Sequence, residues 1–152
     1  MFQSKNPDYK NYVQLKLERN QFGKTLGFRL DEINEGSVVG IMPVQSLHEQ
    51  QNGFVHGGVI STLHDMACGF AAYSLVPEGV QVFTAELNVR YLRKGIGDSI
   101  IAKGRVVKPG KRMMFCESEV FVVNNGEEIL ISKGSSVMAV VDDYVPDKYG
   151  GK

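Results

Sequence analysis

The chain has 152 residues, 43% of them hydrophobic, and it carries 17 basic and 17 acidic residues. This length and composition predict a single globular domain with enough apolar residues to form a core. The balance of charge argues against a nucleic-acid scaffold, although it leaves room for a local basic patch that meets phosphate groups.

Several features of the sequence bear on the compartment in which the protein works. Cys68 and Cys116 have no CxxC spacing, so we expect reduced thiols in a cytoplasmic protein rather than a zinc site or a disulfide framework. The N-terminus lacks the apolar core of a signal peptide. Residues 58–77 are apolar enough to suggest a transmembrane helix, but His64 and Asp65 near its middle make membrane insertion costly, so we expect none.

A short helix is predicted over residues 6–19. Asn6, Pro7 and Asp8 are suited to be the helix cap, the first helical residue and an acid that complements the helix dipole. The apolar residues that follow do not fall on one stripe, so periodicity adds little to this prediction.

A hairpin is predicted next. Leu26, Phe28 and Leu30 alternate along the chain in the manner of a half-buried strand. Residues 34–37 read Asn-Glu-Gly-Ser, which indicates a turn, and the apolar segment 38–44 follows as the second strand.

A pair of glycines introduces the longest helix that the sequence predicts. Gly57 and Gly58 follow His56, and an apolar helical pattern continues from Val59 to Leu75. The first turn of a helix leaves backbone N–H groups unpaired and carries a partial positive charge. Since glycine has no side chain, a ligand carbonyl could approach these two amides as closely as an oxyanion hole requires. The alternative interpretation is a tight loop-to-helix turn with no chemical role.

Asp65 is an acidic residue in the middle of this apolar helix. A carboxylate there must be paired, be hydrated in a cleft or resist ionisation, and we interpret it as a general base or a nucleophile that acts on a carbonyl carbon. Eight residues separate Gly57 from Asp65, so they lie about 12 Å apart along the helix. If both act on one carbonyl, they come from two chains, and an antiparallel two-fold homodimer would bring them together at two equivalent sites.

Four strands are predicted from residue 80 onward. They cover residues 80–92, 99–107, 112–123 and 128–141, and the last break, Asn124-Asn125-Gly126, is a strong hairpin signal. With the N-terminal elements, the order is a helix, two strands, a long helix and four strands. Mostly consecutive antiparallel strands around one buried helix make an α+β domain.

The sequence resembles a known family in the stretch His56-Gly57-Gly58, which is followed by an acid seven residues beyond the second glycine. Over about residues 25–141 it is similar to the hotdog-fold acyl-CoA thioesterases of the phenylacetate-pathway type. The resemblance implies a long central helix wrapped by a curved antiparallel sheet of about six strands, in dimers that pair into tetramers. Residues 1–24 would be an N-terminal helical extension, and residues 142–152 a C-terminal tail.

The same resemblance implies the reaction and several site residues. The reaction is hydrolysis of an aryl or fatty acyl-CoA thioester, with CoA as part of the substrate and no separate cofactor. Gln50, six residues before His56, would orient the water or the thioester, and Asn52 would do so in a shifted register. His56 would polarise the carbonyl or position the loop, and Thr84 would assist the water or hold the acid. Each also has an ordinary structural explanation, and the three histidines of the chain are too scattered to predict a metal site.

A CoA substrate needs cations near its phosphates. Beside the Gly58 amide, the candidates lie at a strand end and around a turn: Arg93, Lys94, Lys108, Lys111 and Arg112, with Lys133 less favoured. Lys and Arg at turns are usually only solvated charge, so none of them stands out.

Two other functions fit the same fold. One is a non-catalytic acyl-CoA-binding protein, which retention of Asp65 disfavours. The other is an enoyl-CoA hydratase or dehydratase, which would have a different motif around its acid and histidine. The spacing from the glycines to Asp65 favours hydrolysis.

Overall fold

The computed structural model describes residues 2–142 of the chain. Their helices and strands are, in order, α1 (Tyr9–Arg19), α2 (Gln21–Leu26), β1 (Arg29–Asn34), β2 (Ser37–Pro43), a short 3₁₀ helix η1 (Ser46–His48), α3 (Gly57–Tyr73), β3 (Gln81–Tyr91), β4 (Ser99–Lys108), β5 (Met113–Asn124) and β6 (Glu127–Val141).

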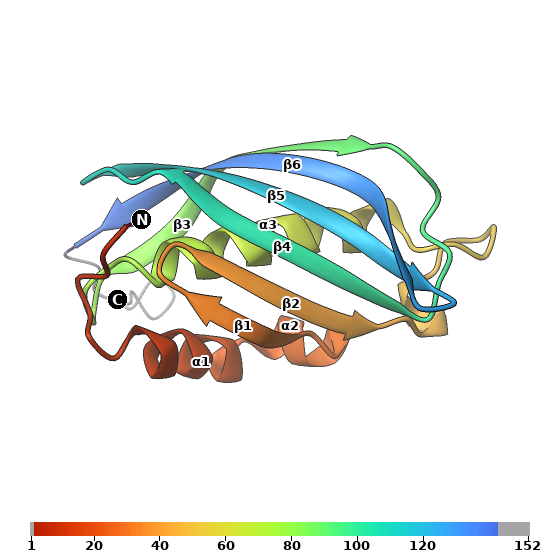
Figure 1. The fold of residues 1–152 in the computed structure, drawn as a ribbon, viewed down its shortest axis with the longest axis horizontal. Coiled ribbons are helices and arrows are strands. Elements are labelled where there is room, and N and C mark those ends of the chain that lie inside the picture. The colour runs from red at the N-terminus through yellow and green to blue at the C-terminus, as the bar shows by residue number, and fades with distance from the viewer. Residues whose placement is uncertain (1, 143–152) are drawn as a thin grey trace, which may run out of the picture.

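The six strands form one antiparallel sheet in the order β1-β2-β4-β5-β6-β3, so that β1 and β3 are its edges. The sheet curves around α3, and α1 and α2 lie below β1 and β2 (Figure 1). A long central helix wrapped by a six-stranded antiparallel sheet is the hotdog fold. The predicted fold class is therefore confirmed.

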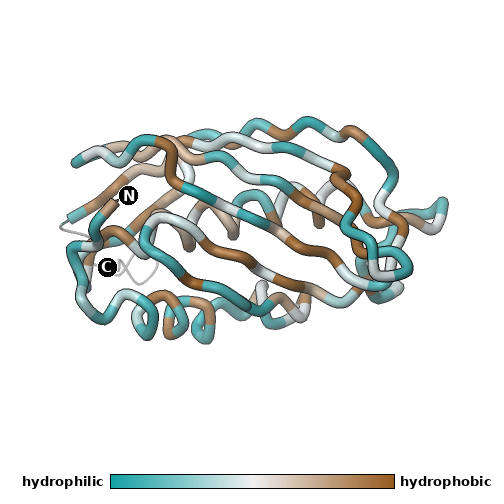
Figure 2. The backbone as a smooth tube through the Cα atoms, viewed as in Figure 1, coloured by the Kyte–Doolittle hydropathy of each residue, from teal (hydrophilic) through white to brown (hydrophobic). Residues whose placement is uncertain are grey.

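Alternating hydropathy along the strands explains why one face of the sheet packs against α3. Every second residue is buried along most of β4 and β5, and hydrophilic and hydrophobic positions alternate along the strands (Figure 2). Ile100 and Val120 from the sheet, and Leu63 and Ala71 from α3, are fully buried in the resulting core. Burial of one large aliphatic side chain stabilises a fold by roughly 1.5–3 kcal/mol, so this interface is a main source of stability.

Two glycines let α3 lie close to the centre of the sheet. Gly104 in β4 and Gly134 in β6 are both register partners of Ser118 in β5, so the three residues form one row across the sheet. A Cβ atom on Gly104 would lie 2.3 Å from the Ala67 carbonyl oxygen, and one on Gly134 would lie 2.6 Å from Nδ1 of His64. A larger residue at either position would require α3 to move away from the sheet.

His64 is the polar group that holds α3 on this row. It is fully buried, with Nδ1 2.7 Å from the Ser118 hydroxyl and Nε2 2.8 Å from the Ser132 hydroxyl. Ser132 donates its own proton to the Arg90 carbonyl oxygen at 2.9 Å, so it accepts from Nε2–H, and Ser118 donates to Nδ1. Burial lowers the pKa of His64 from 6.5 to about 4, and the ring is therefore neutral at neutral pH.

One irregularity in β3 changes which face of the sheet its later side chains point to. Between Thr84 and Glu86 the register with β6 advances by a single residue, which leaves Ala85 as a β-bulge. Side chains in a regular strand alternate between the two faces, so residues seven apart would face opposite ways. Because of the bulge, Thr84 and Tyr91 both contact α3.

The N-terminal helix begins later than predicted. α1 starts at Tyr9 with Asp8 at the N-cap position, so the prediction that Asn6 caps the helix and Pro7 is its first residue is wrong. The Asn6 side chain instead accepts the Asp8 N–H at 2.9 Å, and this local hydrogen bond closes a turn before the helix.

The first predicted strand begins too early. Leu26 is the last residue of α2, a helix that the sequence analysis does not include, and Phe28 precedes β1. Asn20 caps α2 with its side chain, and Gly27 ends it in the left-handed conformation with φ of 72°. These two capping signals outweigh the alternation of apolar residues on which the strand prediction depends.

The remaining predicted strands, from 38–44 onward, are confirmed, and their ends agree with the structure to within one residue. The division into residues 1–24, 25–141 and 142–152 stays a prediction, and nearly all of the predicted tail lies outside the described residues. Over residues 2–142, no helix is long and apolar enough to cross a membrane.

The burial of His64 makes folding stability depend on pH. The imidazole has its ordinary pKa of 6.5 in the unfolded chain and about 4 in the folded chain. Between these values the unfolded state binds more protons. The free energy of unfolding is therefore highest above about pH 6.5. It falls by about 3 kcal/mol in total as the pH is lowered to about 4. Urea unfolding at neutral pH and at about pH 4.5 measures the loss.

The control is His64→Gln, because glutamine does not titrate. The wild-type protein should lose more stability than this variant over the same pH interval. Equal losses in the two proteins would mean that His64 does not carry the pH dependence.

Candidate functional site

The first turn of α3 leaves one backbone donor without a partner in the described chain. The Gly58 N–H donates to Nδ1 of His56 at 2.8 Å, and the N–H groups of Val59 and Ile60 approach the His56 carbonyl oxygen at 3.0 and 3.2 Å. The Gly57 N–H has no acceptor among residues 2–142. Since a helix start is also the positive end of the helix dipole, this amide is suited to bind a negatively charged oxygen.

His56 is the exposed N-cap of α3 and offers a second donor. Because its Nδ1 accepts the Gly58 N–H, a neutral His56 carries its proton on Nε2. Its backbone N–H donates to the His48 carbonyl oxygen at 2.8 Å, which ties the residue to η1. We refer to Gly57 and His56 as the donor half-site.

Asp65 and Thr84, both predicted site residues, are in direct contact. The Thr84 hydroxyl donates to Oδ1 of Asp65 at 2.5 Å, and it also lies 3.5 Å from the sulfur of Met138. Asp65 is only half-buried, and none of the described residues donates a hydrogen bond to its Oδ2. This second carboxylate oxygen is therefore available to a ligand. We refer to Asp65 and Thr84 as the acid half-site.

The two half-sites of one chain cannot act on the same carbonyl. Gly57 is the first residue of α3, and Asp65 lies eight residues further along the same helix. At about 1.5 Å of rise per residue they are about 12 Å apart along the axis. The continuous helix on which this estimate depends is confirmed, and the dimer itself stays a prediction.

The acid half-site opens onto a surface where α3 and the edge strand β3 meet. Five residues of α3 recur at a spacing of three or four and none is fully buried: Gly58, Thr62, Asp65, Gly69 and Tyr73. A Cβ atom on Gly69 would find no atom within 4 Å, and Phe83 of β3 is 43% exposed. β3 has a neighbouring strand on one side only, so its other edge is open to a further chain.

A groove of about 460 Å³ borders the donor half-site. Its lining includes Gln50, Gly57, Tyr91, Arg93 and Lys94, which come from the loop before α3, the helix start, the end of β3 and the loop that follows β3. The structure thus brings Arg93 and Lys94, which lie far along the sequence, together with Gln50 and Gly57.

Of the two candidate amides, Gln50 lines this groove and Asn52 does not. Oε1 of Gln50 accepts the Asn52 N–H at 2.7 Å, which leaves the Gln50 side-chain NH₂ without an acceptor in the described chain. The geometry therefore favours Gln50 as the ligand contact, and its role stays a prediction.

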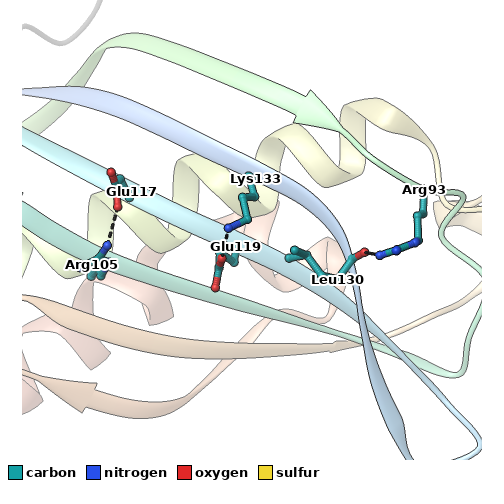
Figure 3. Close-up of polar contacts among 6 residues, drawn as sticks. All are labelled: Arg93, Arg105, Glu117, Glu119, Leu130 and Lys133. Atoms are coloured by element: carbon teal, nitrogen blue, oxygen red, sulfur yellow. Dashed lines mark hydrogen bonds and ion pairs between the residues drawn. The ribbon is translucent and has the colours of Figure 1, made fainter.

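Two of the predicted cations lie at the groove. Nη1 of Arg93 donates to the Leu130 carbonyl oxygen at 3.0 Å (Figure 3), and Nζ of Lys94 lies 5.0 Å from the centre of the Phe54 ring. Neither contact neutralises the positive charge, so both side chains can still attract phosphate groups.

The other predicted cations lie elsewhere. Lys111 lines a cavity with Leu75 at the far end of α3, and Lys108 and Arg112 flank it in the turn between β4 and β5. These three residues lie at the opposite end of α3 from the groove.

Ion pairs cover the outer face of the sheet. Lys133 pairs with Glu119 at 2.8 Å and Arg105 with Glu117 at 2.6 Å (Figure 3). Lys133, the least favoured of the predicted cations, thus has an anionic partner on the face away from α3.

Tyr91 is a residue of the site that the sequence analysis does not identify. Its hydroxyl lies 2.9 Å from the Gly57 carbonyl oxygen and 2.6 Å from the Ser61 hydroxyl. Counted by twos from Thr84, Tyr91 would face away from α3, and only the bulge at Ala85 brings it inward. No sequence signal marks that bulge.

Other candidate reactive groups are not part of the site. Cys68 and Cys116 are free and buried in the core. In the part of the chain that the structure describes, no group of three or more His, Cys, Asp or Glu side chains could hold a metal ion.

Comparisons with known proteins identify relatives of the chain. Residues 52–129, which contain both half-sites, match the family described as the thioesterase superfamily. A thioesterase family protein from Silicibacter pomeroyi has a similar structure, with a TM-score of 0.87 and 33% identity, over 88% of this chain and 98% of that one. Human acyl-coenzyme A thioesterase 13 is 26% identical over 124 residues, which are 80% of this chain and 86% of the relative.

A third similar protein is PaaI of E. coli, from the phenylacetic acid degradation operon. Its structure gives a TM-score of 0.78 at 21% identity, over 88% of this chain and 93% of that one. At this identity the likeness concerns the fold.

The cap at His56 predicts an effect on stability. His56→Ala leaves the Gly58 N–H without its acceptor, so the free energy of unfolding should fall by about 1 kcal/mol. His56→Asn, a residue that also caps helices well, should retain most of the stability. Urea unfolding of both variants measures the difference, and equal losses would show that the cap does not depend on the side-chain acceptor.

Proposed function

The chain belongs to the thioesterase superfamily and is a thioester hydrolase, as the resemblance implied, and we propose that its substrate is an aryl or fatty acyl-CoA. One relative is named an acyl-coenzyme A thioesterase, which supports CoA as the thiol part. Arg93 and Lys94 beside the groove supply charge for its phosphates. CoA is then part of the substrate, and no separate cofactor is required.

The unpaired Gly57 N–H is the observation that carries this proposal. It and the Nε2–H of His56 would hold the thioester oxygen, which gains negative charge as the carbonyl carbon becomes tetrahedral. Gln50 would orient the water or the thioester, and Thr84 would hold the carboxylate of Asp65.

Asp65 can act in either of two ways. As a base, it takes a proton from water while the water oxygen bonds to the carbonyl carbon. The C–S bond then breaks, and the CoA thiolate receives the proton. As a nucleophile, its oxygen bonds to the carbon and expels CoA, and water hydrolyses the acyl-aspartate anhydride.

We further propose that each active site combines the donor half-site of one protomer with the acid half-site of its partner. The axial separation of about 12 Å between Gly57 and Asp65 in one helix supports this arrangement. The open edge of β3 and the uncovered face of α3 would form the two-fold contact between them. The partner would also bring its own Lys108, Lys111 and Arg112, which a single chain keeps away from its groove.

Two finer proposals concern assembly and location. The resemblance supports dimers that pair into homotetramers, and light scattering in solution would separate a tetramer from a dimer. The two free buried cysteines support a cytoplasmic enzyme, because reduced thiols persist there.

Replacement of the acid should abolish turnover. Asp65→Asn keeps the size of the side chain but can neither accept a proton nor attack, so kcat should fall by about 10³-fold. Thiol release from a panel of aryl, short and long acyl-CoAs measures the loss and also the acyl preference.

The matched control is Asp31→Asn, which removes an exposed carboxylate paired with Arg29 at 3.1 Å. It should retain full activity. An active Asp65→Asn enzyme would exclude the acid from the chemistry, and hydration of an enoyl-CoA without thiol release would favour the hydratase reaction instead.

If each active site combines two protomers, two inactive variants should regain activity when they form mixed dimers. Gly57→Pro removes the amide proton at a helix position that accepts proline, and Asp65→Asn removes the acid. Each homodimer has two defective sites, but a mixed dimer has one site with both groups intact. Co-expression in equal amounts should restore about a quarter of the wild-type activity.

Gly57→Ala is the control, because it keeps the N–H and its Cβ would meet Tyr91 at an ordinary 3.5 Å. Its methyl group narrows the approach to the N–H, but the variant should retain far more activity than Gly57→Pro. If co-expression restores nothing although mixed dimers form, both groups act within one chain or not at all.

A further inference from the structure

Tyr91 contacts the peptide bond that follows the Gly57 N–H, the candidate hydrogen-bond donor to an oxyanion. Its hydroxyl approaches the Gly57 carbonyl oxygen at 2.9 Å, and a Cβ atom on Gly57 would lie 3.5 Å from its ring. The N–H of the same peptide unit belongs to Gly58 and donates to Nδ1 of His56 at 2.8 Å. The peptide unit between the two glycines is thus held at both ends, by His56 on one side and by Tyr91 on the other.

Two adjacent glycines make the first turn of α3 flexible unless other contacts restrain it. Glycine has more accessible backbone conformations than any other residue, so the first turn of α3 could fray at Gly57 and Gly58. Fraying would reorient the Gly57 N–H, whose value as an oxyanion donor depends on a fixed direction. A hydrogen bond from β3 opposes this motion, because β3 is anchored along β6.

The Ser61 hydroxyl also lies near the Gly57 carbonyl oxygen. Each hydroxyl has one proton, so Ser61 and Tyr91 cannot both donate to Gly57 and also bond to each other. The hydroxyls of Tyr91 and Ser61 are 2.6 Å apart, so one of them donates to the other. The Ser61 hydroxyl lies 3.1 Å from the Gly57 carbonyl oxygen, and the Tyr91 hydroxyl is closer at 2.9 Å. The shorter distance favours the order in which Ser61 donates to Tyr91 and Tyr91 donates to Gly57.

We propose that Tyr91 is a positioning residue for the proposed thioester hydrolysis: its hydroxyl fixes the Gly57–Gly58 peptide and thereby directs the Gly57 N–H. This role rests on the proposed function. Tyr91 does not need to touch the thioester, although it lines the groove. Loss of its hydroxyl should therefore lower kcat more than it raises KM.

The test compares three hydroxyl deletions. Tyr91→Phe should lower kcat about tenfold, the value of one hydrogen bond, and leave KM within about twofold. It should also shift the ¹H–¹⁵N signals of Gly57 and Gly58. Ser61→Ala should leave kcat within about twofold of wild type, because Tyr91 still donates to Gly57. Tyr9→Phe, which removes a hydroxyl from α1, should change neither measurement.

The amide signals separate failure of this proposal from failure of the proposed function. If Tyr91→Phe leaves both glycine signals in place, the hydroxyl does not fix the peptide and the inference is wrong. If the signals shift but kcat is unchanged, the Tyr91 hydroxyl fixes the peptide without affecting turnover, and the proposed positioning role is wrong. A larger loss in Ser61→Ala than in Tyr91→Phe would transfer the role to Ser61. A wild-type protein that hydrolyses no acyl-CoA overturns the proposed function and the role of Tyr91 with it, while the signals still report the contact.

Discussion

The rotation of α3 about its own axis determines where both half-sites lie. His64 points into the sheet, where two serine hydroxyls bind both ring nitrogens, and Gly134 leaves space for the ring. Adjacent helix residues are about 100° apart around the axis, so Asp65 must then point toward the side where β3 lies. A helix turned by one residue would bury the carboxylate and expose the imidazole. The paired histidine therefore selects one orientation at a point where apolar packing alone would tolerate several.

The distance between the half-sites also has an electrostatic reason. A carboxylate beside an unpaired N–H at a helix start would form a hydrogen bond with it, since the helix dipole favours negative charge there. Asp65 would then neutralise the donor that the substrate needs. A separation of eight residues prevents this contact within one chain and leaves Gly57 unpaired. In the proposed dimer, the thioester would lie between this N–H and the carboxylate of the partner's Asp65, so the substrate itself would keep the two groups from pairing.

Local patterns in the sequence were enough to predict the central helix and the later strands, because each has a strong periodicity and a clear turn at its ends. An acid in an apolar helix marked Asp65, and the family resemblance added Thr84; the structure places the two in contact. Reasoning from local patterns failed at α2, where apolar alternation suggested a strand and the caps at Asn20 and Gly27 decided for a helix. It also missed Tyr91, because only the register between β3 and β6 reveals the bulge that puts Tyr91 on the same face of β3 as Thr84.

That register has a consequence for how the strand can change over evolution. Exposed loop tips usually tolerate the gain or loss of a residue, whereas in a strand such a change turns every following side chain to the other face. Because Ala85 is an extra residue in β3, Thr84 contacts Asp65 and Tyr91 contacts the start of α3, although both belong to the same strand. A deletion there would turn one of these side chains outward while leaving the core of the sheet intact. The number of residues between Thr84 and Tyr91 therefore decides whether one strand can contact both the acid and the start of α3.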